Sequence, residues 1–215
     1  MAASLANTNL TLDNTSAITI PATPAAGQIV LYPKADKLLY YKDDAGVEQR
    51  VVTPLTPATG SVIQVISVTK TDFFSTSSTS YVDVTGVSAT ITPRSTLSRI
   101  LVTITGGSTS SDSVTNAFGY GVILRGSTQI GIGNSRGSAQ RTTMDLALGS
   151  PSNISNLVKP FAVTLLDSPA TTSATTYKLQ VVSTVNSLGI GGSWSTSDGN
   201  RSNIPTIITL MEIAG

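Results

Sequence analysis

The side chains that carry most enzyme and metal chemistry are missing from this sequence. Its 215 residues include no histidine and no cysteine. Histidine is the most common general base near neutral pH and a frequent metal ligand, and cysteine supplies thiolate nucleophiles, thiolate ligands and disulfides. Histidine-dependent triads, thiolate sites and a disulfide framework are therefore excluded, and we predict no catalytic residue, no metal site and no cofactor.

Carboxylates remain as candidates, because two acids that flank one glycosidic bond can hydrolyse it. Nearly all the acids of residues 61–215 fall at the ends of β-rich runs, where aspartate ordinarily supports its own backbone. We therefore predict turn acids and a protein that is not an enzyme. The acids in question are Asp72, Asp83, Asp112, Asp145, Asp167, Asp198 and Glu212. The same interpretation applies to Asp36, Asp43 and Asp44, although their oxygens could also suit calcium.

One segment combines an aromatic ring with hydrogen-bonding groups. Trp194, the only tryptophan, is followed by Asp198, Asn200 and Arg201 within a stretch rich in glycine, serine and threonine. The ring could stack on a sugar while the polar side chains bond to its hydroxyls. We predict these four as glycan-contacting residues. The alternative is that Trp194 fills the core or a subunit contact, where aromatic residues are equally at home.

Two classes of partner are disfavoured. The net charge is only +1 and the charges of both signs are interleaved, so the chain offers no basic stripe for nucleic acid. The glycines of residues 131–137 resemble a phosphate-binding loop, but they follow no βαβ unit, and a hairpin turn explains them better. No run approaches the roughly 18 apolar residues of a membrane helix. We expect neither nucleic-acid binding nor membrane insertion.

The composition predicts an all-β fold. Serine, threonine, valine, isoleucine and glycine are abundant and only 12% of residues are charged, whereas exposed helical faces need many charged residues. Several runs alternate in polarity as half-buried strands do. They favour a jelly-roll-like β-sandwich, with an immunoglobulin-like sandwich or a closed barrel as alternatives. The expected strands are 62–69, 80–84, 87–92, 99–105, 118–124, 129–133, 141–148, 159–166, 176–184 and 206–213.

The rest of the chain divides by its turn residues. We expect an extended N-terminal arm over residues 1–23, a small β-meander over 24–53, a linker over 54–60 and the sandwich over 61–215. Prolines and a glycine interrupt any ladder within the linker. A three-stranded sheet is marginal in isolation. The meander is therefore expected to pack against copies of itself and to serve in docking or trimerisation.

Several short motifs occur in the order found in phage virion proteins. Residues 60–72 (GSVIQVISVTKTD) resemble the opening of a domain widespread in such proteins. The meander resembles a piece of phage tail-fibre proteins, where residues 24–27 lead into Leu31-Tyr32 and residues 41–43 precede 46–48. Further matching motifs of the larger domain are residues 74–75, 82–86, 90–95, 98–102, 165–177 and 206–213.

This resemblance implies a bacteriophage structural protein located in the virion and assembled in the bacterial cytoplasm. It favours a homotrimeric fibre or spike, attached to other virion proteins by its N-terminal region, with the sandwich displayed outward. The alternatives are a decoration protein of the capsid and a module that recognises a host surface glycan. Burial between identical subunits would also protect the long edge strands of such a sandwich.

Overall fold

All described parts of the chain are strands or irregular segments, which confirms the predicted all-β class. The computed structural model describes residues 20–36, 38–51, 57–110, 118–146, 158–184, 187–194 and 202–215. Within these ranges no helix is long and apolar enough to cross a membrane. The chain divides into two compact units, Met1–Thr56 and Pro57–Gly215. Residues 1–19 of the predicted arm and residues 54–56 of the predicted linker lie outside the described residues.

The first unit contains the predicted meander. Its strands are β1 (Val30–Pro33), β2 (Leu39–Lys42) and β3 (Glu48–Arg50), and they pair antiparallel in the order β1-β2-β3. Asp43 accepts hydrogen bonds from the backbone amides of Ala45 at 3.1 Å and Val47 at 2.7 Å. These bonds shape the turn between β2 and β3, as the interpretation of Asp43 as a turn acid predicted.

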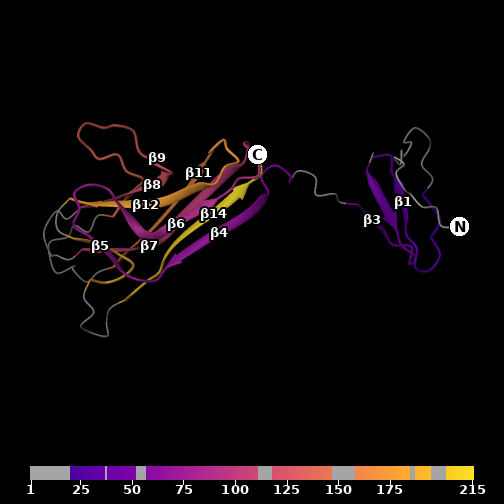
Figure 1. Cartoon of the computed structure of the whole chain (residues 1–215), viewed down its shortest axis with the longest axis horizontal. Coiled ribbons are helices and arrows are strands. Elements are labelled where there is room, and N and C mark those ends of the chain that lie inside the picture. The colour runs from indigo at the N-terminus through magenta and orange to yellow at the C-terminus, as the bar shows by residue number, and fades with distance from the viewer. Residues whose placement is uncertain are drawn as a thin grey trace. The chain divides into compact units, whose positions relative to one another are not determined.

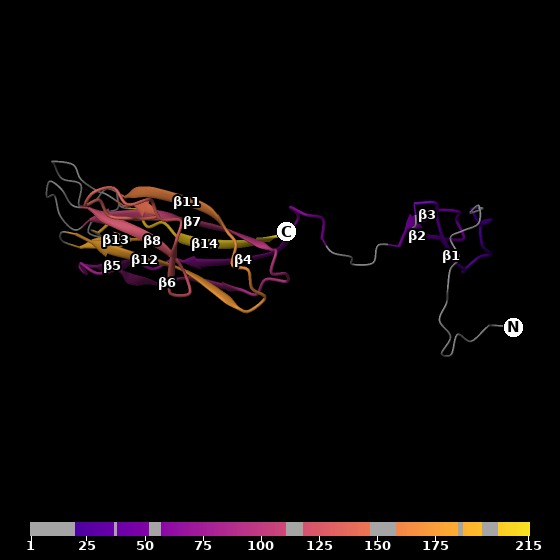
Figure 2. The same cartoon turned by 90° about the horizontal axis from the view of Figure 1, so that it is seen from above.

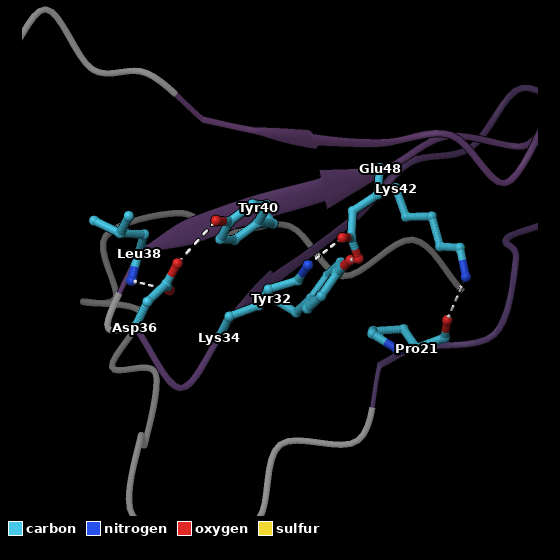
Figure 3. A network of polar contacts seen from close by, with 8 residues as sticks. All are labelled: Pro21, Tyr32, Lys34, Asp36, Leu38, Tyr40, Lys42 and Glu48. Carbon is cyan, nitrogen blue, oxygen red and sulfur yellow. Dashed lines mark hydrogen bonds and ion pairs between the residues drawn. The ribbon is translucent and has the colours of Figure 1, made fainter.

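One face of the meander carries a polar network (Figure 3). Glu48 accepts hydrogen bonds from the Tyr32 hydroxyl and the Lys34 ammonium group, and Asp36 accepts one from Tyr40 at 2.8 Å. Burial, followed by the Glu48 carboxylate, raises the pKa of Tyr32 to about 12. The hydrogen bond from Lys34 is the largest cause of a lowered pKa at Glu48. This face is therefore organised by its own charges and hydroxyls.

The second unit consists of two sheets (Figure 1). In one sheet β4, β14, β7 and β11 lie side by side. Beyond the start of β14, the short β13 takes its place beside β7, and β5 pairs with β13 as β4 pairs with β14. In the other, β6, β12 and β8 are neighbours, and β9 and β10 share the free edge of β8. The strands are β4 (Val62–Lys70), β5 (Phe74–Thr76), β6 (Val82–Ile91), β7 (Arg99–Ser110), β8 (Gly119–Arg125), β9 (Thr128–Ile130), β10 (Met144–Asp145), β11 (Lys159–Asp167), β12 (Thr175–Ser183), β13 (Leu188–Ile190) and β14 (Thr206–Ile213).

The order of these strands is that of a jelly roll. The chain passes from β4 to β6, back to β7, across to β8 with β9 and β10, back to β11, across to β12 and finally to β14, so it changes sheets at almost every connection. Eight strand tracks wound in this way form the two Greek keys of the fold. The predicted jelly-roll-like sandwich is confirmed.

Strict alternation places the core between the sheets. In β14 every second residue is buried, beginning with Thr206 and including Ile208 and Leu210 at 0% exposure. These side chains meet those of β7, such as Ile104, and of β12, such as Leu179, in one apolar cluster. Two twisted sheets bury one face each in this manner. The outward positions of β14 remain half-exposed.

The strand predictions differ from the structure in several places. Of the predicted strand 141–148, only Met144–Asp145 forms a strand among the described residues, and the strand predicted over 99–105 continues to Ser110. The residues predicted as two strands, 80–84 and 87–92, belong to the single strand β6. Gly86, at a φ of +89°, lies where the pairing of β6 with β12 is irregular, and the pairing continues on both sides of it. β5 and β13, with three residues each, had no counterpart among the predicted strands. The glycines of 131–137 form no hairpin between β9 and β10, since both strands pair with β8.

The two ends of the sandwich differ (Figure 2). At one end, called here the linker end, the chain enters and leaves: the Gly60 amide donates to Ala214 at 2.8 Å and the Ala214 amide to Ser61 at 2.9 Å. The opposite end, called here the loop end, carries the connections β4–β6, β7–β8, β10–β11 and β12–β14. Loops on a rigid scaffold are where binding sites commonly lie.

Candidate binding surface at the loop end of the sandwich

Two aromatic rings meet at the loop end. Trp194 packs edge-on against Phe73, with ring centroids 5.5 Å apart and an interplanar angle of 82°. Phe73 precedes β5 and is 39% exposed, and Trp194 is half-buried. Edge-to-face packing is a favourable geometry for aromatic pairs. Trp194 is thus anchored on one side by Phe73 while part of its surface stays accessible.

Glycines make room for this pair. A Cβ at Gly189 in β13 would lie 2.5 Å from the Phe73 ring and 2.7 Å from the Thr109 methyl group, so the ring needs a residue without a side chain beneath it. Gly191 has a φ of +97°, which favours glycine, and turns the chain out of β13. Gly192 then forms an isolated bridge with Asn203. The chain is therefore held on both sides of Trp194.

Replacing Gly189 with alanine is expected to displace the Phe73 ring, because the added methyl group would overlap it. Trp194 is the only tryptophan, so its fluorescence reports the local change without interference. We expect a shifted emission maximum in a protein that remains folded. The control is Gly133→Ala, at a glycine where a Cβ would meet nothing within 4 Å. Equal emission spectra for G189A and the wild type would contradict the role of Gly189.

An ion pair lies beside the aromatic pair. The Lys70 ammonium group donates to Asp72 at 2.6 Å, and the side chains are 3% and 78% exposed respectively. The hydrogen bond from Lys70 is the largest cause of a lowered pKa at Asp72. A buried charge requires such a partner. Asp72 is thus engaged in neutralising Lys70 at the end of β4.

Of the four predicted glycan-contacting residues, the structure describes Trp194 alone. Asp198, Asn200 and Arg201 lie outside the described residues. The interpretation of Trp194 as a sugar platform stays a prediction. Phe73 was not singled out in the sequence, although the glycines of residues 189–192 signal that a large side chain packs closely there.

The described acids of the sandwich have partners within the fold. Asp83 bonds to Lys178 and Gln180, Asp167 to Arg125 and Tyr177, and Glu212 to Gln64 and the amide of Arg94. Asp112 and Asp198 lie outside the described residues. Within the described part of the chain, no group of three or more acids is placed to hold a metal ion. Absence of catalysis stays a prediction.

Comparisons with known proteins give only distant similarity. No family model matches the sequence, and no curated protein matches it either. The chain is similar to a structure of infectious bursal disease virus Gx strain, with 13% identity and a TM-score of 0.36 over 83% of this chain and 46% of that one. It is also similar to a structure of the Gt strain of this virus, with 15% identity and a TM-score of 0.37 over 86% of this chain and 47% of that one. The chain thus spans about half the length of these two, and likeness at this level assigns it no role.

Proposed function

We propose that the chain is a non-enzymatic structural component of a phage particle, most simply a homotrimeric fibre or spike. Its N-terminal unit would attach it to other virion proteins, and its jelly roll would be displayed outward. Three features support this proposal: the ordered motifs that resemble those of phage virion proteins, the division into two compact units, and an apolar face of the meander that the described residues leave partly exposed. The last of these carries the proposal.

This partly exposed apolar face lies opposite the polar network of the meander. Pairing places Leu31 of β1 beside Tyr41 of β2, and Pro33 beside Leu39, so all four side chains point to one side of the sheet. Leu31 is 48% exposed and the other three are half-exposed. A three-stranded sheet with a partly exposed apolar face gains stability by burying it further. A second and third copy of the same sheet are suitable covers, since symmetric association lets identical faces complete one another.

The oligomeric state tests this proposal directly. Light scattering coupled to size exclusion should give the full chain three times its 22.1 kDa mass. Leu31→Asp should convert it to monomer, because three carboxylates would have to be buried at the contact. Leu97→Asp is the matched control, since this leucine is 72% exposed on the β6–β7 connection of the sandwich. A monomeric wild type, or a trimeric L31D protein, would refute the trimer formed through this face.

Assembly into particles tests the virion role separately. Particles grown without the protein and complemented with the wild-type chain should contain it, whereas the L31D variant should be depleted. Antibody labelling seen by electron microscopy distinguishes a fibre at the tail from a decoration protein spread over the capsid. Failure of the wild-type chain to enter particles would refute the virion role.

A further inference from the structure

A cavity of about 420 Å³ opens on the outer face of the β6–β12–β8 sheet, near the loop end. It is lined by Val182 of β12, Tyr120 of β8 and Tyr81, which precedes β6. Thr79, Gln140 and Thr184 contribute hydroxyl and amide groups to the lining. Cavities of roughly 300–1,000 Å³ with an apolar floor and a few polar groups are typical ligand sites.

The described lining carries no charge. A phosphate or carboxylate ligand would need a cation or a set of aligned amides, so the lining favours an uncharged ligand. Aromatic faces contact the C–H surfaces of such a ligand, and hydroxyl and amide groups exchange hydrogen bonds with its hydroxyls. A sugar ring has both kinds of surface, one on its faces and one around its rim.

One polar atom of the cavity wall has no partner. The Tyr81 hydroxyl oxygen is shielded from solvent and makes no hydrogen bond to the described chain. A buried tyrosine hydroxyl usually finds a partner, and leaving it without one is unfavourable. Burial, followed by the Tyr120 phenol, raises the pKa of Tyr81. The group is therefore a protonated donor at neutral pH. A ligand hydroxyl can reach this oxygen only when one of the groups that cover it moves.

The backbone around the cavity is held in place. The Ser183 amide donates to Ser78 at 2.9 Å, and the amide and the hydroxyl of Thr184 both donate to the Phe118 carbonyl at 3.0 Å. The Phe118 ring, 40% exposed, is parallel to that of Tyr120 with centroids 6.4 Å apart. These contacts fix the end of β12 against the start of β8, and binding sites gain affinity from such preorganised walls.

We propose that this cavity binds a neutral sugar ring, with Tyr120 as the stacking surface and Tyr81 and Gln140 as hydrogen-bonding groups. The site is separate from the Trp194–Phe73 pair, and it does not depend on trimer formation by the meander. If the chain is displayed on a particle, a sugar site near the loop end of the sandwich would make it a receptor-binding component.

Saturation-transfer NMR on the full chain tests the site with three probes: the methyl glycosides of glucose, galactose and N-acetylglucosamine, at millimolar concentration. At least one should receive saturation from the wild type, and glucuronic acid should receive less. Gln140→Ala should weaken binding about fivefold, the equivalent of one hydrogen bond of about 1 kcal/mol. Gln129→Ala, at an exposed glutamine of β9 that does not line the cavity, should leave binding unchanged.

Tyr81→Phe distinguishes a ligand contact from a purely structural role. Removing an unpartnered hydroxyl should leave the melting temperature unchanged or raise it, while binding of the responsive glycoside falls about fivefold. Absence of saturation transfer to all three glycosides would overturn the proposal, as would unchanged binding in both Q140A and Y81F. Loss of binding in Trp194→Ala with normal binding in Q140A would place the sugar at the other aromatic site and also overturn it. None of these outcomes alters the particle-incorporation result.

Discussion

Replacing Asp167 with alanine is expected to lower the free energy of unfolding of the sandwich by about 3 kcal/mol, because it removes the acceptor of two buried or partly buried donors. Asp167 ends β11 and accepts bonds from Arg125 of β8 at 2.9 Å and from the Tyr177 hydroxyl of β12 at 2.7 Å. It therefore joins the two sheets. Denaturant unfolding followed by Trp194 fluorescence measures the loss in the unit that contains these residues.

The Tyr177 hydroxyl accounts for much of this cost. Tyr177 is 0% exposed, and its burial, reinforced by the Asp167 carboxylate, strongly raises its pKa. In D167A the hydroxyl would remain buried without an acceptor. Tyr177→Phe should therefore destabilise D167A less than it destabilises the wild type, by about 1 kcal/mol or more, and this difference is the coupling term of a double-mutant cycle. Strictly additive effects would show that the two residues do not depend on each other.

An exposed ion pair provides the control. Asp83 bonds to Lys178 at 2.8 Å, but its side chain is 52% exposed. Solvent screens such pairs, and they contribute about 0–1 kcal/mol. Asp83→Ala should therefore cost far less than Asp167→Ala. If the two substitutions cost the same, burial and the Tyr177 contact would not be the source of the Asp167 effect.

The second large effect concerns pH and the buried Glu212. This residue is 0% exposed, and its carboxylate accepts bonds from Gln64 at 2.5 Å and from the Arg94 amide at 2.7 Å. Burial acts to raise its pKa, but hydrogen bonds from its neighbours and the charge of Arg94 outweigh burial and lower the pKa. The carboxylate therefore stabilises the fold above the pKa of the unfolded chain. That contribution is lost as the pH falls through the lower pKa of the folded state.

Glu212→Gln isolates this contribution. A glutamine would present an NH₂ group to one of the two donors, so at pH 7 we expect a loss of about 2–3 kcal/mol. Protonated Glu212 has the same defect, since one of its oxygens carries a hydrogen. The wild-type and E212Q stabilities should therefore converge as the pH is lowered from 7 toward 3, measured by denaturant unfolding at each pH. A constant difference across this range would contradict a pH-dependent role for Glu212.

Alternation in the sequence was sufficient to predict the fold class and most long strands. Residues 206–213 were predicted with the correct bounds from their β-rich composition, although only Ile208 and Leu210 of the four buried positions are apolar. Ile207, Met211 and Ile213 are apolar on the other face, so the sequence did not show that Glu212 is buried. β5 and β13 escaped prediction because three residues are too short for a period to be seen, and their pairing depends on the contact between Gly189 and Phe73.

Sites built from distant residues were harder to predict. Asp167 was interpreted as a turn acid because its partner Arg125 lies 42 residues away and joins it only through the crossing of the two sheets. Tyr81 and Tyr120 line one cavity because β6 and β8 both flank β12. A single sequence contains no periodic signal that links such positions. These residues are close because of the order in which the strands of the jelly roll pair. The sequence predicted a jelly-roll-like fold, but it did not predict which strands are neighbours or how their residues align.

Entry and exit of the chain at one end also set how the sandwich responds to force. β4 begins at the linker end and runs toward the loop end, paired with β14 from Val62 opposite Ile213 to Lys70 opposite Thr206. A pull on the linker, with the loop end held, acts parallel to this ladder, so its hydrogen bonds resist together in shear. The same pull applied against the C-terminus would open the ladder one bond at a time. The sandwich is thus mechanically strongest along the axis from its linker to its loops.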